Sequence, residues 1–148
     1  MNKAGLVIAA ISGAVAVAVA APVIAQNSSY TLGTVWQVSS IKVVPGQFEN
    51  YLDYLGGNWR KQLEFGKQQG YVVSYHIFSV NNPRENEPDL FLAVEYKDYI
   101  PVAQQLEYQK KFEAMMATDA HKMDAGSGAR VPMRKEAGSM ELQELKLK

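Results

Sequence analysis

The order in which the hydrophobic period changes along the chain limits its fold more than any single motif does. Residues 34–44 (TVWQVSSIKVV) are rich in β-branched side chains and partly alternate, which predicts a strand. Residues 47–70 place apolar side chains three and four positions apart, which predicts one amphipathic helix. Residues 71–80 and 89–97 again have strand-like composition, and a polar loop separates them. The first two thirds of the chain therefore predict strand, helix, strand and strand.

The last third completes this order. Residues from about Ile100 to Met116 share an apolar side and predict a second helix, whereas residues 117–138 lose the period and predict a frayed turn and a loop. Ser139–Leu147 alternates weakly and predicts a closing strand. The full order predicts an α+β fold of the ferredoxin-like βαββαβ type, with an antiparallel sheet and both helices on one face.

Glycine and proline residues mark where the first helix should begin, bend and end. Pro45-Gly46 ends the first strand, and Gly70 suits a C-terminal helix cap. The Gly56-Gly57 pair inside the helix costs about 2 kcal/mol relative to two alanines. We therefore expect a kink or a close backbone contact at this pair.

The N-terminal segment has the pattern of a removable export signal. Lys3 supplies a short positive start, an apolar stretch follows, and Pro22 precedes the small residues that a signal peptidase reads. The pattern predicts a signal peptide over residues 1–25, cleavage after Ala25, and an exported protein that is periplasmic or secreted. The alternative is an uncleaved membrane anchor, because the apolar stretch is long enough to cross a bilayer. Pro22 and the lack of a following basic cluster favour cleavage, with no stable membrane insertion afterwards.

The remaining residues predict one domain. Residues 26–33 are polar and aperiodic, which predicts a disordered N-terminal tail, and residues 34–148 predict the ferredoxin-like domain. The absence of cysteine excludes disulfides, thiolate nucleophiles and zinc-thiolate sites, so an exported domain of this kind must be held by packing. Fifteen basic and fifteen acidic residues balance, which gives no electrostatic basis for binding nucleic acid.

One face of the predicted sheet carries more apolar surface than a monomer usually exposes. The third strand places Leu90, Leu92 and Val94 on one side, and this aliphatic row should face the helices. The opposite side then carries apolar and aromatic side chains from three strands, namely Val72, Phe78, Phe91, Trp36 and Val38. Such a patch is rarely left in water, and an identical sheet placed by a two-fold axis is the simplest cover. We therefore expect a homodimer.

Three segments together resemble the dimeric α/β-barrel superfamily. These are VWQVSSIKVVPGQFENYLDYL, GYVVSYHIFSV and PDLFLAVEYKD, and the strand, Pro-Gly and aromatic helix start at residues 43–48 form the most family-like piece. The superfamily includes antibiotic-biosynthesis monooxygenase-like, NIPSNAP-like and stress-responsive barrel proteins. The resemblance covers residues 34–147 and implies two sheets packed face to face, with a small cavity in each barrel.

The resemblance does not assign a reaction, because members differ in what the cavity does. Some oxidise quinol-like aromatic compounds without a cofactor, some bind or degrade haem, and some isomerise lactones. The Asn, Trp and His arrangement of haem-degrading members does not transfer, since Asn58 and Trp59 adjoin on the first helix and His76 lies on a strand. Function must be argued from the site itself.

His76 is the strongest candidate functional residue. It interrupts an otherwise apolar strand, on the face expected to line the barrel and within reach of Ser74 and Glu95. A neutral imidazole there could accept a phenolic proton, hold a metal or haem, or act as the polar contact for a ligand. The purely structural alternative is a histidine hydrogen-bonded across the barrel. The predicted ligand pocket consists of side chains on this face: Trp36, Ser74, His76, Phe78, Phe91 and Glu95.

A second histidine lies in the stretch ATDAHKMD, between Asp119 and Asp124. Asp–x–His can bind a divalent cation, but two ligands at this spacing are common by chance. We therefore expect no metal, and no cofactor is predicted.

Three classes of function remain open at this point. The leading hypothesis is that the barrel binds a small apolar or aromatic molecule, with His76 as its polar contact. The second is a cofactor-independent monooxygenase or isomerase in which His76 is the base. The third is a structural or interaction module whose barrel is filled by side chains.

Overall fold

The computed structural model describes residues 28–148. The predicted signal peptide over residues 1–25 and its cleavage position therefore lie outside the described residues. The elements, in chain order, are β1 (Tyr30–Val43), α1 (Phe48–Tyr54), the π-helical segment η1 (Leu55–Trp59), α2 (Arg60–Gln68), β2 (Val72–Ser79), β3 (Leu90–Tyr96), α3 (Val102–Met116), α4 (Ala120–Ala129) and β4 (Arg134–Leu147).

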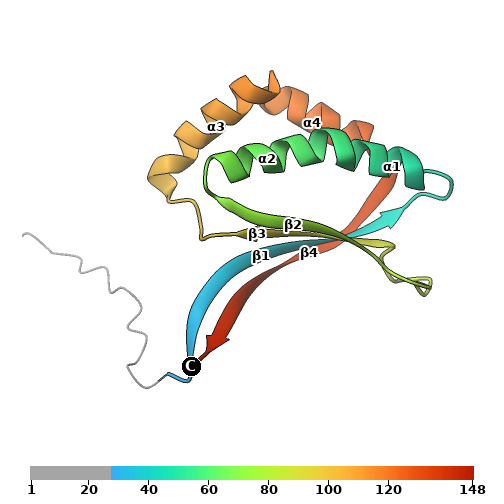
Figure 1. The fold of residues 1–148 in the computed structure, drawn as a ribbon. Coiled ribbons are helices and arrows are strands. Elements are labelled where there is room, and N and C mark those ends of the chain that lie inside the picture. The colour runs from blue at the N-terminus through green and yellow to red at the C-terminus, as the bar shows by residue number, and fades with distance from the viewer. Residues whose placement is uncertain (1–27) are drawn as a thin grey trace, which may run out of the picture.

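The four strands form one sheet in the order β2-β3-β1-β4, and every neighbouring pair is antiparallel. Each helical connection therefore crosses over a strand before the chain re-enters the sheet. This is the ferredoxin-like βαββαβ arrangement, and the predicted α+β fold class is confirmed. Figure 1 places all the helices on the same side of the sheet, as the sequence predicted.

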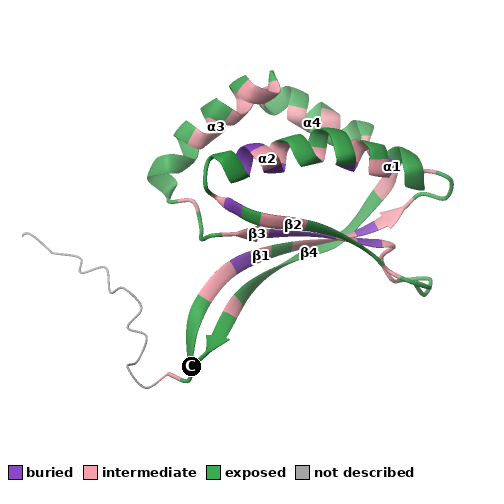
Figure 2. Ribbon diagram, viewed as in Figure 1, coloured by how far each residue is buried: buried purple, intermediate pink, exposed green. Residues whose placement is uncertain are grey.

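The core lies between this sheet and the continuous helix formed by α1, η1 and α2. Apolar side chains three and four residues apart bring Tyr51 and Leu55 onto the sheet, where they pack against Ile41, Leu90 and Leu92. A second cluster joins Leu63, Val72 and Val94 further along the helix. Figure 2 shows the buried residues on the first helix and on the sheet, whereas α3 and α4 contain none.

The helix α3 contacts α2 through aromatic side chains. Phe65 of α2 meets Tyr108 and Phe112, with ring centroids 5.5 and 6.0 Å apart. Val102 and Leu106 belong to the stretch that was predicted to share an apolar side, but both are exposed. The second helix is therefore held by an aromatic cluster rather than by its aliphatic residues.

The predicted disturbance at the glycine pair is a π-helical segment. The first helix is continuous from Phe48 to Gln68, but the backbone of Leu55–Trp59 winds as a π-helix around Gly56 and Gly57. Single π-helical turns inside an α-helix are rare and need a local reason. Glycine supplies one here, because it weakens the α-helical preference at two successive positions.

We predict that alanine at Gly57 stabilises the protein whereas alanine at Gly66 destabilises it. A Cβ atom at Gly57 would meet no other atom within 4 Å, so Gly57→Ala should gain about 0.4–1 kcal/mol from reduced unfolded-state entropy. A Cβ atom at Gly66 would lie 2.6 Å from Val72 Cγ2, so Gly66→Ala should cost about 1–3 kcal/mol by overpacking. Urea unfolding measures both values, and equal effects of the two changes would contradict the packing described here.

Strand β1 begins earlier than the sequence predicted. Residues 30–33, expected to belong to a disordered tail, are strand residues, because Tyr30, Thr31 and Leu32 pair with the last residues of β4. This pairing continues beyond the paired part of β3, which ends opposite Val35. The extension formed by residues 30–32 and 145–147, here called the β1–β4 arm, projects from the sheet in Figure 1.

Strand β4 and helix α4 were also misjudged from the sequence. The strand begins at Arg134 rather than Ser139, and Gly138 permits this with φ +133° beside a register shift opposite Ser40 and Ile41. Residues 120–129, predicted as a turn and loop, form α4 despite two glycines. Asp119 stabilises its start, since the carboxylate accepts a hydrogen bond from Lys122 N at 2.9 Å.

A β-bulge corrects the predicted position of Val72. The register shifts between Val72 and Ser74, so that Val72 faces the helices and is 8% exposed. It belongs to the core and not to the opposite face of the sheet. Within residues 28–148, none of the helices has the length and apolar character needed to cross a membrane.

Candidate functional site

The six residues predicted to form a pocket lie on one face of the sheet, turned away from the helices. We call this the open face. The strand register aligns Trp36 with Glu95 and Phe78 with Phe91, and the alternation of β3 sends Leu92 and Val94 to the other side. The open face carries Trp36, Val38, Ser74, His76, Phe78, Phe91, Ala93, Glu95, Met140 and Leu142. These side chains form a surface and not an enclosed chamber, and no described helix lies over it (Figure 1).

Three parallel rings form an aromatic row across this face. The rings of Trp36 and His76 are 6.1 Å apart between centroids with an interplanar angle of 18°. The rings of His76 and Phe78 are 5.6 Å apart at 24°. These are offset-stacked geometries, which aromatic rings prefer over direct face-to-face contact. The row therefore presents a continuous π surface with one nitrogen-bearing ring at its centre.

A small residue in β3 lies beside the aromatic row. Ala93 lies between Val38 and His76 in the strand register, and it is only 4% exposed although its side chain is on the open face. Its neighbours therefore cover it. A larger side chain at this position would compete with the rings for the same space.

Next to the aromatic row, a polar row crosses all four strands. Ser74 of β2 donates to Glu95 Oε2 of β3 at 2.6 Å, and Thr34 of β1 donates to Glu95 Oε1 at 2.9 Å. The Thr34 hydroxyl also lies 3.2 Å from Glu144 Oε2 of β4. The row is thus Ser74, Glu95, Thr34 and Glu144, and it places two carboxylates beside the stacked rings.

Thr34 and Glu144 were missed by the sequence analysis. A β-bulge between Leu32 and Val35 brings Glu144 against β1, where its Oε2 also accepts from the backbone N–H of Thr34 at 3.0 Å. That backbone hydrogen bond holds the pKa of Glu144 below its ordinary value. The available signal was Gly33, since a glycine inside a strand often marks a bulge.

The partners of Ser74 and Glu95 differ from those expected. Both were expected within reach of His76, but Ser74 and Glu95 bond each other, and the second Glu95 oxygen accepts from Thr34. The contacts of His76 in the structure are to the rings of Trp36 and Phe78. The open face therefore carries two separate groups of side chains. One is an aromatic surface that includes an imidazole, and the other is a row with carboxylates that accept hydrogen bonds.

The second histidine candidate does not gather metal ligands. Asp119, which was considered with His121 as a cation-binding pair, caps α4. Among residues 28–148 there is no group of three or more His, Asp or Glu side chains placed to hold a metal ion.

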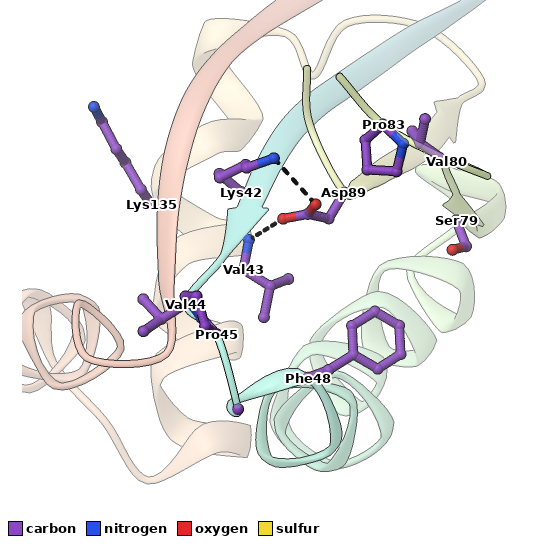
Figure 3. A pocket seen from close by; sticks show the side chains of 11 residues that line it. Lys42, Val43, Val44, Pro45, Phe48, Ser79, Val80, Pro83, Asp89 and Lys135 are labelled. Carbon is purple, nitrogen blue, oxygen red and sulfur yellow. Dashed lines mark hydrogen bonds and ion pairs between the residues drawn. The ribbon is translucent and has the colours of Figure 1, made fainter. Parts of the chain in front are cut away.

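A hollow of about 580 Å³ lies at the end of β1, away from the open-face rows. Figure 3 shows its main polar feature, Asp89, which bonds Lys42 Nζ at 3.2 Å and the backbone N–H of Val43 at 2.7 Å. Lys42 Nζ also donates to the Glu87 carbonyl at 2.9 Å. These bonds tie the start of β3 to the end of β1, so we assign Asp89 and Lys42 a structural role.

Comparison with known proteins yields similar structures but no similar sequence. No protein-family model and no curated protein matches the chain. HapK from Hahella chejuensis is 9% identical over 74% of this chain and 91% of its own, with a TM-score of 0.46. Protein SO0527 from Shewanella oneidensis is 10% identical over 79% of this chain and 98% of its own, with a TM-score of 0.47.

A third similar structure is a NIPSNAP family protein of unknown function from Agrobacterium tumefaciens. It is 8% identical over 78% of this chain and 90% of its own, with a TM-score of 0.42. At these identities the likeness concerns the fold alone, and the chain's topology is that of an antiparallel α+β sheet protein with its helices on one face.

Proposed function

We propose that the protein is an exported homodimer of the α/β-barrel type that binds a small apolar or aromatic molecule between the open faces of two protomers. The observation that carries this proposal is the aromatic row of Trp36, His76 and Phe78, in which Trp36 is half-buried and the other two rings are exposed, on a sheet face that no described helix covers (Figure 1). Export rests on the leader-like residues 1–25.

Exposed apolar side chains support association through the open face. Phe78 is 52% exposed, and Met140 and Leu142 are each 47% exposed, on three positions of the same face. Contiguous apolar surface of this kind usually marks an interaction site. A two-fold axis lets the same patch cover itself, which is the commonest arrangement of soluble oligomers.

The side chains of the open face support the proposed ligand class. Parallel rings favour a flat aromatic molecule that stacks on them or edge-packs against them. The imidazole of His76 offers a hydrogen-bond acceptor for a phenolic hydroxyl group when it is neutral. The adjacent carboxylates of Glu95 and Glu144 add acceptors at one end of the row. A planar aromatic molecule that carries a hydroxyl group matches this surface.

The binding test uses 2-naphthol as a probe and isothermal titration calorimetry on the chain beginning at residue 26. We expect binding by a dimer, and we expect His76→Ala to weaken it about tenfold, the effect of one hydrogen bond and one ring contact. His121→Ala is the matched control, because it removes the chain's other histidine from exposed positions on α4. Equal effects of the two changes, or no binding, would contradict the proposal.

The enzymatic alternative shares the same imidazole. His76 is exposed beside two rings, so a bound phenol or quinol could transfer its proton to the imidazole and become more easily oxidised. Oxygen consumption with a quinol that His76→Ala abolishes would favour the monooxygenase. A dimer whose open faces exclude 2-naphthol altogether would favour the side-chain-filled structural module.

A further inference from the structure

The β1–β4 arm carries exposed apolar side chains on one of its two faces. Tyr30 pairs with Leu147 and Leu32 pairs with Leu145, and residues directly opposite each other in an antiparallel pair point to the same side. These four side chains therefore share one face of the arm, which we call the apolar arm face. Their exposed fractions run from 39% at Tyr30 to 85% at Leu147, and Figure 2 shows the outer part of the arm as exposed.

The apolar arm face is distinct from the open face. Along β4, residues 143, 145 and 147 point to one side of the strand. Gln143 pairs with Val35, which is buried and precedes Trp36 of the open face, so this side of β4 is the helix side of the sheet. The arm projects beyond the helices, so no described helix covers its apolar face (Figure 1). A dimer formed through the open face uses the other side of the sheet.

The size of the apolar arm face favours a lipid surface over a protein partner. A stable protein–protein interface buries about 800 Å² and about 20–30 residues on each partner, whereas this face consists of four side chains. A bilayer sets no such threshold. Each apolar side chain that enters the interfacial region contributes in proportion to its own buried area.

The sequence that precedes the arm brings a bilayer to this place. Residues 4–25 form the apolar stretch of the leader, which is long enough to cross a bilayer, and residues 26–29 are all that separates it from Tyr30. Four residues span at most about 14 Å when fully extended. While the leader is attached and inserted, Tyr30 therefore begins within that distance of the membrane. The arm is the first folded part of the domain that the membrane meets.

The charges at the tip of the arm suit an anionic membrane. Residues 28–32 and 145–148 contain two lysines, Lys146 and Lys148, and no acidic side chain. Glu144 at the base of the arm lies 3.6 Å from Lys146 Nζ and offsets part of its charge, whereas Lys148 lies further out along the arm. Lysine residues next to an apolar contact add attraction to anionic headgroups.

We propose that the apolar arm face docks on the surface of a lipid bilayer and keeps the domain at the membrane after the leader has been removed. The three leucines enter the apolar side of the interface. Tyr30 combines an apolar ring with a polar hydroxyl group, and tyrosine is enriched at membrane–water boundaries for this reason. The proposal rests on the proposed export and is independent of the ligand site on the open face.

The backbone of the arm limits how deeply it can enter the bilayer. The pairing of β1 with β3 ends opposite Val35, and beyond that residue β1 pairs with β4 alone. The arm is therefore a two-stranded ribbon with an unpaired backbone edge on each side. Unpaired backbone groups cost free energy in hydrocarbon, so the contact lies at the level of the headgroups and does not span the membrane.

The test is flotation of the chain beginning at residue 26 with vesicles made of equal parts of phosphatidylcholine and phosphatidylglycerol. We expect the protein to float with the vesicles at millimolar lipid. The combined change Leu145→Ser and Leu147→Ser should lower the partition coefficient by at least about tenfold, because two leucine side chains no longer leave water. The matched control combines Val102→Ser and Leu106→Ser, which removes two exposed aliphatic side chains from α3 and should leave flotation unchanged.

A fluorescent label measures the same contact without removing both leucines. The chain has no cysteine, so one introduced cysteine can be labelled selectively. A polarity-sensitive dye at Leu147→Cys should shift its emission to shorter wavelength when vesicles are added, and the same dye at Leu106→Cys should not. Lys148→Gln should weaken binding to the mixed vesicles by about two- to fivefold and leave binding to pure phosphatidylcholine unchanged.

Three results would overturn the proposal. These are no flotation of the unchanged chain, equal losses in the arm and α3 variants, and an emission shift at Leu106 without one at Leu147. If the arm variant lowers the sedimentation coefficient in the absence of lipid and the unchanged chain does not float, a second copy covers the arm instead. None of these measurements involves 2-naphthol, so failure here is distinguishable from failure of the proposed function.

Discussion

Replacing Leu55 with alanine should lower the free energy of unfolding by about 2–5 kcal/mol, the range for removing a buried leucine side chain. Leu55 is 1% exposed and belongs to the core cluster with Ile41, Tyr51 and Leu90. It is also the first residue of η1, where the flanking helix and the sheet both fix its position, so the core has little freedom to close over a cavity. Urea or thermal unfolding monitored by circular dichroism measures the change.

Leu106→Ala supplies the matched control for this prediction. It makes the same chemical change on α3, where Leu106 is 65% exposed, and should alter stability by no more than about 0.5 kcal/mol. A loss at Leu55 as small as that at Leu106 would show that the helix does not pack on the sheet as described.

Replacing Leu142 with aspartate should raise the dissociation constant of the proposed homodimer by about a hundredfold or more. Leu142 lies opposite Trp36 on the open face and is 47% exposed, so the change should leave the single chain folded. In a face-to-face dimer, two-fold symmetry would place an unpaired carboxylate from each protomer in the apolar contact, at a cost of several kcal/mol. Sedimentation velocity across a concentration series measures the shift toward monomer.

Val102→Asp distinguishes this effect from a general change in charge. Val102 is 82% exposed at the start of α3, on the helix side of the molecule, and an aspartate there suits the helix N-terminus. This variant should remain dimeric. Dissociation by both variants, or by neither, would locate the interface somewhere other than the open face.

The central part of the fold could be predicted from the sequence because the spacing of its apolar residues matches the side that each element buries. The alternation of Leu90, Leu92 and Val94 and the helical spacing of Tyr51 and Leu55 each indicate one buried side, and the structure packs those sides together. Helix α4 lacked such a pattern, since it has no buried residue and owes its start to the Asp119 cap. A helix held by capping and turn geometry leaves little hydrophobic signal to detect.

The candidate sites were predictable only in part, for a related reason. Alternation alone assigned Trp36, His76 and Phe78 to one face, because every second residue of a regular strand points to the same side of the sheet. A β-bulge interrupts this alternation. The bulges near Thr34 and Val72 are the reason why the polar row was not predicted and why Val72 was assigned to the wrong face.

The β1–β4 arm brings the two ends of the described chain to one point, since Lys148 N donates to the Ser29 carbonyl at 3.0 Å. Figure 1 places this point at the far end of the arm from the helices. An immobilising tag or fusion partner attached at either of these ends would therefore hold the protein at the tip of the β1–β4 arm. Surface-tethered binding assays made through either end should therefore give the same orientation.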